Sequence, residues 1–287
     1  MSHPPLISAA ELAAALAGPT TSRPLVIDCS FDLADREAGN RAYASGHIPG
    51  AIHLDLENDL SAPKNGRNGR HPLPERAAFA QVLARVGAND DTLIVAYDTG
   101  NGSFAARLWW MVGWTGHAAV ALLDGGVGAW RAAGQSLTAE PAAPRAPGHF
   151  SLREPLATLV RLEEVRANLD RPQRVVVDAR AADRFRGENE TLDPIAGHIP
   201  GARNRFFGNN LQSDGRFKPA AQLRAEFEAV IGQRPGTDVI SQCGSGVTAC
   251  HNLLAMEIAG LTGGALYAGS WSEWSAQPGA PVATGAD

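Results

Sequence analysis

The hexapeptide GHIPGA at residues 46–51 recurs letter for letter at residues 197–202. Further pairs of similar segments follow the same order along the chain: 25–28 with 175–178, 94–97 with 239–242, and 125–130 with 269–274. One shared hexapeptide can arise by chance, but four landmarks in one order indicate a tandem duplication. The sequence therefore predicts two copies of one fold.

The length and the linker composition agree with two copies. A chain of 287 residues corresponds to about two domains at roughly 100–200 residues each. The segment 138–149 contains three prolines and a glycine without apolar periodicity, as expected of a linker. We therefore expect a first domain at 1–137, a linker at 138–149 and a second domain at 150–287.

Composition limits the possible partners and location. Lys and Arg number 25 against 30 Asp and Glu, so the net charge of −5 argues against nucleic acid or an anionic membrane as the main partner. No apolar run approaches the roughly 18 residues of a membrane-spanning helix. The segment 9–17 contains Glu11 and lacks a preceding basic region, so it is a poor signal peptide. Three cysteines are too few for a disulfide framework, and we expect a cytoplasmic protein.

Each copy alternates short apolar runs with helical stretches. The expected buried parallel strands are 25–28, 92–97, 120–123, 174–178 and 237–242. The expected helices are 9–17 behind a Ser8–Glu11 capping box, 74–86, 104–112, 220–231, and 248–258 ending near Gly260. Strand–helix alternation predicts an α/β fold with a parallel sheet in each half.

The clearest chemical signal is the run from Asp238 to Cys250, which passes from a strand through a glycine-bearing loop into a helix. Cys243 falls at the carboxyl end of the strand, where ligand sites of open α/β sheets lie. Gly244 and Gly246 allow successive backbone N–H groups to point inward, and the helix adds its positive end. Thiols in such settings have pKa values of roughly 3.5–7.5 rather than ~8.5. The loop is therefore expected to hold a nucleophilic thiolate and an attached anionic group.

The competing interpretation makes Cys243 a small buried hydrophobe at a turn, the usual environment of a free cysteine. The duplication bears on this choice, because the corresponding position in the first copy is Asp98. A carboxylate cannot perform thiol chemistry. If the chain has one active site, it belongs to the second copy.

Two other chemistries fit less well. Cys243, Cys250 and His251 are not spaced as paired metal-ligand clusters, so no metal site is expected. We expect Cys250 to be packed, His251 to lie on the surface, and Cys29 to lie in the core. A tyrosine-phosphatase loop requires an arginine six residues after the cysteine, to bind phosphate. That position is Ala249.

The chain resembles the tandem-domain rhodanese family over nearly its whole length. The features that carry the resemblance are the duplicated GHIPGA, the replaced thiol of the first copy, the CGSGVTA loop at 243–249 and the GSWSEW segment at 269–274. The family comprises thiosulfate and 3-mercaptopyruvate sulfurtransferases. The resemblance implies two tandem rhodanese-like domains, each a parallel sheet flanked by helices. Within the family, CGSGVT is the mercaptopyruvate type, whereas the thiosulfate type usually carries basic residues after the cysteine.

The resemblance also implies a reaction. Cys243 would take sulfur from 3-mercaptopyruvate as a persulfide and release pyruvate, and a thiol, thioredoxin or cyanide would then accept the outer sulfur. Backbone N–H groups of Gly244, Gly246, Val247 and Thr248 would stabilise the anionic persulfide. No cofactor is implied. The alternatives are the same chemistry with thiosulfate, or a non-enzymatic sulfur carrier or interaction module.

The family's substrate-carboxylate arginine matches Arg184, whose planar guanidinium suits a carboxylate. Without the family context, Arg184 would be interpreted as part of a solvated charged turn. Mercaptopyruvate enzymes often have a second arginine shortly before the second GHIPG, but residues 187–196 contain none. Either Arg186 takes its place or the donor preference differs.

A Ser–His–acid relay has been proposed for the mercaptopyruvate type. Ser245 matches its serine, His71 its histidine and, less securely, Glu57 its acid. The relay would lie in a cleft between the two domains. The alternative for His71 is a loop residue that stabilises the following proline turn. His47 and His198, which occur in both GHIPG segments, are expected to be structural. The expected core or interface aromatic residues are Trp109, Trp110, Trp271 and Trp274.

Overall fold

The chain forms two compact units in the computed structural model, which describes residues 3–286. The first unit contains the chain up to Ser61, Pro74–Leu156 and Leu211–Phe217. The second contains Ala62–Leu73, Ala157–Asn210 and the chain from Lys218 onward. Two short segments thus cluster with the unit built mainly from the other copy, which the repeat did not predict. The domain limits proposed from the sequence remain a prediction.

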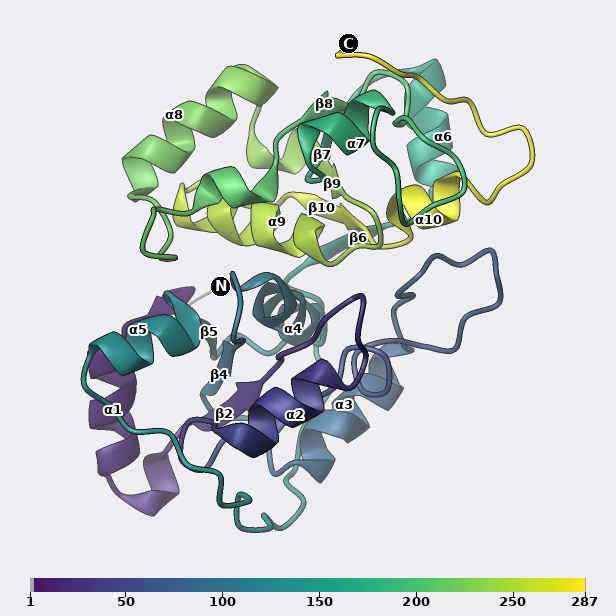
Figure 1. The fold of residues 1–287 in the computed structure, drawn as a ribbon. Helices are drawn as coiled ribbons and strands as arrows, with labels where there is room; N and C mark the ends of the chain where they lie inside the picture. Colours follow the sequence, from purple (N-terminus) through teal and green to yellow (C-terminus); the bar gives the residue numbers. More distant parts are fainter. Residues whose placement is uncertain (1–2, 287) are drawn as a thin grey trace. The chain divides into compact units, whose positions relative to one another are not determined.

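The two units have the same sheet topology (Figure 1). In the first unit the strands are β1 Leu6–Ile7, β2 Leu25–Asp28, β3 Ile52–His53, β4 Ile94–Tyr97 and β5 Val120–Leu123. In the second they are β6 Thr158–Val160, β7 Val175–Asp178, β8 Arg203–Asn204, β9 Val239–Gln242 and β10 Ala265–Tyr267. The orders are β1-β5-β4-β2-β3 and β6-β10-β9-β7-β8, with every pairing parallel. The predicted duplication and α/β class are confirmed.

Helices follow the strands in both units (Figure 1). The helices of the first unit are α1 Ala9–Ala17, α2 Ala38–Ser45, α3 Arg76–Arg85, α4 Ser103–Trp114 and α5 Gly126–Ala132. Those of the second are α6 Leu162–Asp170, α7 Ala182–Arg186, α8 Ala220–Ile231, α9 Thr248–Ile258 and α10 Ser270–Trp274. The 3-10 turns are η1 Thr20–Ser22, η2 Phe207–Asn210 and η3 Gly236–Asp238. The strand expected at 237–242 starts two residues later because η3 occupies its beginning.

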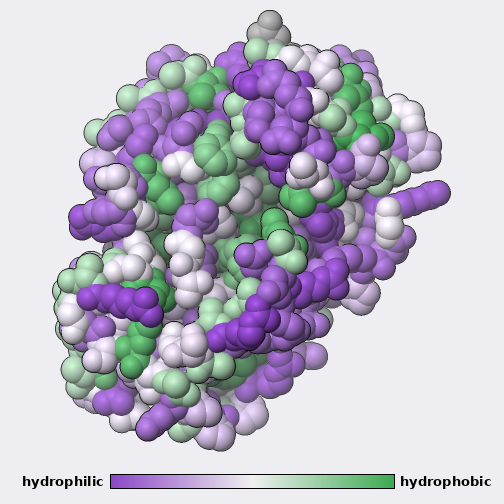
Figure 2. All heavy atoms as spheres, viewed as in Figure 1, coloured by the Kyte–Doolittle hydropathy of each residue, from purple (hydrophilic) through white to green (hydrophobic). Residues whose placement is uncertain are grey.

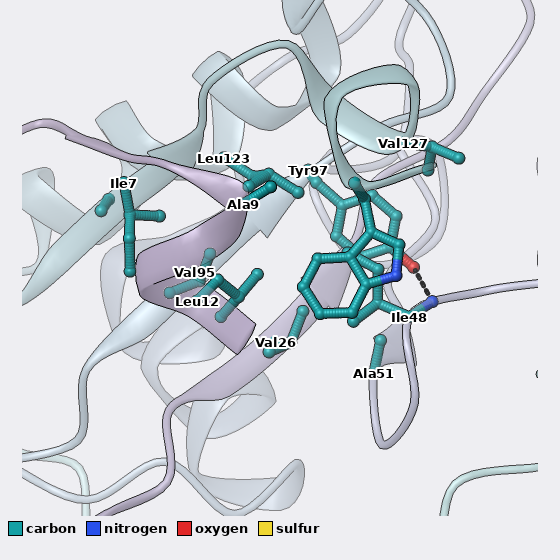
Figure 3. Close-up of a cluster of buried hydrophobic side chains, with 12 residues drawn as sticks. Ile7, Ala9, Leu12, Val26, Ile48, Ala51, Val95, Tyr97, Leu123 and Val127 are labelled. Atoms are coloured by element: carbon teal, nitrogen blue, oxygen red, sulfur yellow. Dashed lines mark hydrogen bonds between the residues drawn. The ribbon is translucent and has the colours of Figure 1, made fainter. Parts of the chain in front are cut away.

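Helices bury both faces of the first sheet. One face carries a cluster that joins Val95 and Tyr97 of β4 to Leu12 of α1 and Trp130 of α5 (Figure 3). The Ile48 N–H donates to the Tyr97 hydroxyl over 3.2 Å, which ties the first GHIPG turn to this cluster. The alternate residues of β4 are also fully buried, and α4 contacts β4 and β5. Burial on both faces explains why these strands are continuous apolar runs in the sequence.

The second unit is packed in the same way. Its core cluster joins Val176 of β7 and Ile240 of β9 to Trp271 and Trp274 of α10. Helix α9 contacts β9, β10, α8 and η2, so nearly every side of it is covered. His251 on α9 is therefore fully buried, and its Nδ1 accepts a hydrogen bond from the Asn210 Nδ2, 3.1 Å away. The prediction that His251 lies on the surface was wrong, because it allowed for only one buried face of the helix.

The two cysteines and four tryptophans that the sequence predicts to be packed are buried. Cys250 and Cys29 are buried, and the cysteines of the described chain are all free thiols. The four tryptophans expected in the core or at an interface are each at most 3% exposed: Trp109, Trp110, Trp271 and Trp274.

The repeated GHIPGA segments form matching turns. In each, the histidine Nδ1 is 2.8 Å from a carbonyl of the preceding helix: that of Tyr43 for His47 and that of Phe185 for His198. Each imidazole also stacks on the ring of that same residue. Both histidines are buried, and both form a backbone bridge to a later segment of their own unit. These contacts support the structural role expected for them.

Among residues 3–286, the exposed large apolar side chains are Leu33, Leu152, Leu156, Leu192, Ile195 and Val282. On the face drawn in Figure 2, hydrophobic residues form small groups separated by hydrophilic ones. Within residues 3–286, no helix is both long and apolar enough to cross a bilayer.

Helix α1 begins with the predicted capping box. The Glu11 N–H donates to the Ser8 hydroxyl over 3.2 Å, and the Ser8 N–H donates to the Glu11 carboxylate over 2.9 Å. Two N–H groups at the helix start are thereby satisfied.

We predict that Ser8→Ala lowers the opening free energy of the α1 amides by about 1 kcal/mol, because a capping acceptor is lost. Hydrogen exchange of these amides measures the effect. The control is Ser45→Ala, at the exposed end of α2, which should leave the opening free energy of the α1 amides within about 0.5 kcal/mol of wild type. Equal effects of the two substitutions would contradict the role of the cap.

Candidate active site

The candidate site lies at the carboxyl end of β9, an inner strand of the second sheet. β9 is paired on one side with β7 and on the other with β10. The loop 243–247 connects β9 to α9 (Figure 1). Cys243 is the first residue after the strand, so the main chain places it where parallel α/β sheets bind ligands.

The thiol of Cys243 is buried, yet it faces polar backbone. The residue is 2% exposed, and the Gly246 N–H donates to its Sγ across 3.1 Å. This curl of the loop depends on Gly246, whose φ is +76°. A Cβ atom at this position would lie 2.3 Å from the Ala268 carbonyl oxygen, so only glycine fits. The loop thus directs an N–H dipole at the sulfur.

The start of α10 holds the loop from the other side. Trp271 and Ser272 donate their N–H groups to the carbonyls of Cys243 and Gly244, at 3.0 and 2.9 Å. The Cys243 N–H donates to the Ser270 hydroxyl, 3.0 Å away. Ser270 has φ +54°, a left-handed backbone conformation that costs energy in a residue with a side chain. The GSWSEW segment therefore positions the Cys243 loop.

The thiol of Cys250, on α9, also contacts the loop. The Cys250 Sγ donates to the Gly246 carbonyl oxygen, 3.2 Å away. This contact gives Cys250 a packing role.

The first copy has the same loop, with a carboxylate in place of the thiol. Asp98 Oδ1 accepts the N–H groups of Gly100 and Gly102, both at 2.9 Å. Its Oδ2 accepts those of Phe104 and Ala105, at 3.1 and 3.2 Å. Burial raises the pKa of this carboxyl group even though the four N–H groups act to lower it. The N–H groups of this strand–loop–helix junction therefore converge on one acceptor, which in the first copy is a side chain of the protein.

Ser245 and His71 lie together in the second unit. The Ser245 hydroxyl is 2.8 Å from the His71 Nδ1, and both residues are buried. His71 reaches this position because it belongs to Ala62–Leu73, the segment of the first copy that clusters with the second unit. Glu57 belongs to the first unit, where its carboxylate lies 3.2 Å from Arg36. The role of Glu57 in a relay stays a prediction.

The two predicted arginines have different surroundings. Arg184 is half-buried and pairs with Glu190 at 2.8 Å and with Asp193 at 3.4 Å. Arg186 pairs with Glu188 at 2.7 Å, and the Glu188 side chain is exposed. Val247 is buried at the end of the loop, and Thr248 is the first residue of α9.

The structure also assembles charged residues that the motif did not predict. Arg180 is 3% exposed, and its guanidinium lies against Asp178, Glu190 and the Trp271 ring. Burial lowers the pKa of Arg180, but these carboxylates and Cys243 outweigh burial and raise it overall. Burial would also raise the pKa of Glu190, but hydrogen bonds from Arg184 and the Leu192 N–H keep it below its usual value.

Arg70 is a further arginine of this cluster, with its Nη1 at 2.7 Å from Asp193. In the sequence, the only indication that Arg70 lies near the site is its position directly before His71. Within the described residues, no group of three or more His, Cys, Asp or Glu side chains is arranged to hold a metal ion.

Comparisons with known proteins agree with this geometry. The model of the rhodanese-like domain matches residues 8–133 and again residues 161–277. A probable 3-mercaptopyruvate sulfurtransferase of Pseudomonas aeruginosa is 49% identical over 99% of this chain and 100% of its own length. A putative thiosulfate sulfurtransferase of Mycobacterium tuberculosis is 38% identical over 98% of this chain and 97% of its own length. The solved structure of a 3-mercaptopyruvate sulfurtransferase from Escherichia coli superposes with a TM-score of 0.80 at 30% identity, covering 94% and 99% of the two chains.

The fold and the thiol loop define a tandem α/β enzyme of the sulfurtransferase class, which acts on a small-molecule sulfur donor and a sulfur acceptor. The chain belongs to the rhodanese family.

We predict that Asp98→Ala destabilises the first unit by about 1–3 kcal/mol, because buried N–H groups lose their acceptor. Urea unfolding followed by circular dichroism measures the loss. Asp32→Ala is the matched control, since this exposed carboxylate accepts one N–H group, that of Ala34. If Asp98→Ala were as stable as the control, the fold of the loop after β4 would not depend on the Asp98 carboxylate.

Proposed function

We propose that this enzyme moves the sulfur of 3-mercaptopyruvate to a thiol acceptor through a persulfide on Cys243, in which it is carried as sulfane sulfur. The observation that carries the proposal is the 3.1 Å hydrogen bond from the Gly246 N–H to Sγ, in a loop of backbone amides that precedes α9. Backbone N–H groups and a helix N-terminus stabilise negative charge that develops beside them. They would favour the persulfide anion for the same reason.

In the first step, the Cys243 thiolate attacks the thiol sulfur of the donor. An S–S bond forms and the donor C–S bond breaks, and its electron pair passes to the carbon as the enolate of pyruvate. The proton of the donor thiol balances the step, since it ends on this carbon while the persulfide remains anionic. Binding the reactants in one site replaces a bimolecular encounter by a positioned attack.

The Ser245–His71 pair would assist this step. Its 2.8 Å contact lets the hydroxyl donate toward the developing enolate oxygen while the imidazole keeps the hydroxyl oriented, or passes a proton through it. Ser245 is two residues from Cys243, so the pair belongs to the same loop. Glu57 would complete the relay.

In the second step, an acceptor removes the outer sulfur. A thiolate, such as that of thioredoxin, attacks the outer sulfur, the persulfide S–S bond breaks, and Cys243 returns as the thiolate. Cyanide attacks in the same way and leaves as thiocyanate. We expect this chemistry in the cytoplasm, because the few cysteines fit a reducing compartment and the segment 9–17 is a poor signal peptide.

Thiosulfate is the second candidate donor. A curated relative at 38% identity is named as a putative thiosulfate sulfurtransferase. With thiosulfate, attack on the outer sulfur would release sulfite. The residue directly after Cys243 is glycine and not a basic residue, which is the pattern that the family resemblance assigns to the mercaptopyruvate type.

We predict that wild-type protein releases pyruvate from 3-mercaptopyruvate and gains one sulfur atom on the peptide that contains Cys243. Cys243→Ser should do neither, because a hydroxyl cannot form a persulfide. Cys29→Ser is the matched control with a buried free thiol outside the site. Pyruvate and thiocyanate assays with each donor, together with peptide mass spectrometry, measure the outcome. Full turnover by Cys243→Ser would contradict the mechanism, and faster turnover with thiosulfate would reassign the donor.

We predict that Ser245→Ala lowers kcat with 3-mercaptopyruvate by about 10²-fold, the range for losing one donor to a developing oxyanion. His71→Gln should have an effect of similar size, and the double variant should lose little more, because the two residues act as one unit. Steady-state kinetics of the three variants test this. Additive losses would show that Ser245 and His71 act independently.

A further inference from the structure

The 188–196 loop, which follows α7, has its two ends close together. It is bordered by Gly187 and Gly197, and a Cβ atom placed on Gly187 would lie 3.2 Å from the Gly197 nitrogen. The C-terminal segment closes this neck further, because a Cβ atom on Gly197 would lie 2.4 Å from the Ala283 carbonyl oxygen. A compact surface loop with adjacent ends is an Ω-loop, a type of loop that frequently carries function.

The inner side of the 188–196 loop borders the Cys243 loop. The Asp193 carboxylate lies 2.7 Å from the Nη1 of Arg70. The Nη2 of the same arginine lies 2.9 Å from the position that a Cβ atom of Gly244 would take, and Gly244 directly follows Cys243. The Arg70 side chain therefore connects the 188–196 loop to the loop that carries the reacting sulfur.

The outer side of the 188–196 loop carries exposed apolar side chains. Leu192 and Ile195 are 45% and 42% exposed, and they are two of the six exposed large apolar side chains in the described part of the chain. A third is Val282, whose Cγ1 lies 2.7 Å from the position that a Cβ atom of Gly197 would take at the end of the loop. Apolar side chains that are exposed as a group, rather than singly, mark an interaction surface.

Backbone contacts hold both apolar residues of the loop in place. The Leu192 carbonyl accepts a hydrogen bond from the Arg70 Nη1 at 3.3 Å, and the Ile195 carbonyl accepts one from the Trp271 Nε1 at 2.8 Å. Trp271 also donates its backbone N–H to the Cys243 carbonyl. The exposed side chains are therefore fixed in position relative to the reacting residue.

The segment 62–73 contacts this loop through Arg70 and is basic. It contains three Lys and Arg residues and no acidic residue, whereas the chain as a whole has a net charge of −5. Two of the three, Lys64 and Arg67, are exposed. The segment is anchored to α10, because the Arg70 N–H donates to the Ser272 hydroxyl over 2.9 Å. A partner with acidic side chains on its binding face would be attracted to this edge of the site.

We propose that a protein acceptor docks on the rim of the site, formed by residues 62–73 and the outer side of the 188–196 loop. The acceptor would present a cysteine thiol on a face that is apolar and acidic. The inference rests on the proposed function and names the kind of partner that acts in its second step. Cys243 is 2% exposed, so an acceptor thiol reaches its persulfide only past the residues that border it. A protein that delivers a thiol there has to rest on this rim, whereas a small thiol does not.

Transfer to a protein dithiol balances without a further reagent. One thiolate attacks the outer sulfur of the persulfide, the S–S bond breaks, and Cys243 leaves as the thiolate. The second thiol of the acceptor then attacks the cysteine sulfur that carries the transferred atom. This atom leaves as hydrogen sulfide with the proton of the second thiol, and the dithiol is oxidised to a disulfide. Dithiothreitol performs the same chemistry without a protein surface.

The experiment measures pyruvate release from 3-mercaptopyruvate with either reduced thioredoxin or dithiothreitol as the acceptor. In the double variant Leu192→Ser/Ile195→Ser, kcat/KM for thioredoxin should fall about tenfold, because two apolar contacts are lost. The rate with dithiothreitol should stay within about twofold of wild type, because the backbone contacts of the loop remain. The matched control is Leu33→Ser, an exposed leucine of the first unit, which should change neither rate.

The variant Arg67→Glu tests the charge of the partner. At low ionic strength kcat/KM for thioredoxin should fall about fivefold, and the loss should shrink as added salt screens the charges. The rate with dithiothreitol should not change. Faster turnover of thioredoxin by Arg67→Glu would show that the partner's face is not acidic, and it would overturn the inference.

Unchanged thioredoxin kinetics in the double variant would also overturn the inference. An equal loss with both acceptors would do the same, because it indicates that the apolar residues only support the loop. If light scattering showed a smaller particle for the double variant while its kinetics were unchanged, the rim would be a contact between copies of this chain instead. Wild-type protein that turns over with dithiothreitol and not with thioredoxin would refute the docking and leave the proposed function. Absence of pyruvate with both acceptors would refute the proposed function itself.

Discussion

The site depends on backbone N–H groups that point at a side-chain acceptor where a parallel strand meets a helix. The duplicated chain presents this interaction twice, with two different occupants. In the first copy, the Asp98 carboxylate accepts four N–H groups and fills the loop. In the second, the Cys243 sulfur accepts one from Gly246, and a thiol in place of the carboxylate permits an attached group to extend beyond it. The two copies therefore compare a carboxylate and a thiol in the same strand–loop–helix junction.

Around this loop, the second unit adds a layer of paired charges. Arg70, Arg180 and Arg184 face Asp178, Glu190 and Asp193, so the cluster is balanced when all six groups are ionised. Burial of the guanidinium groups would be costly without these carboxylates. The carboxylates also hold the arginine side chains in fixed orientations.

Much of the fold follows from patterns that are local in sequence. Helices Ala220–Ile231 and Thr248–Ile258 and strand Leu25–Asp28 have the predicted limits, because apolar periodicity and turn residues mark them. The repeat predicted one topology for both copies, and the sheets confirm it. The surface position predicted for His251 failed because η2 and α8 cover a side of α9 that the local pattern cannot reveal.

The site was predictable to the extent that its residues lie in one loop. Cys243, Ser245 and the glycines form one short motif, whereas Arg70 and His71 come from a segment distant in sequence that clusters with the second unit. A resemblance indicated His71, but no pattern in the chain indicated that the neighbouring arginine faces Gly244. Such contacts are set by tertiary packing on α10, through Gly69 and Ser272, and they are visible only in three dimensions.

The most direct test of the account is a crystal structure of the wild-type protein after treatment with 3-mercaptopyruvate in the absence of an acceptor. The account predicts additional density for one sulfur atom on the Cys243 Sγ, within hydrogen-bond distance of the N–H groups of the 243–248 loop. The account would be contradicted by a sulfur bound to another cysteine, or by an outer sulfur that points away from these amides. Either result would show that the N–H groups of the 243–248 loop do not bind the transferred atom.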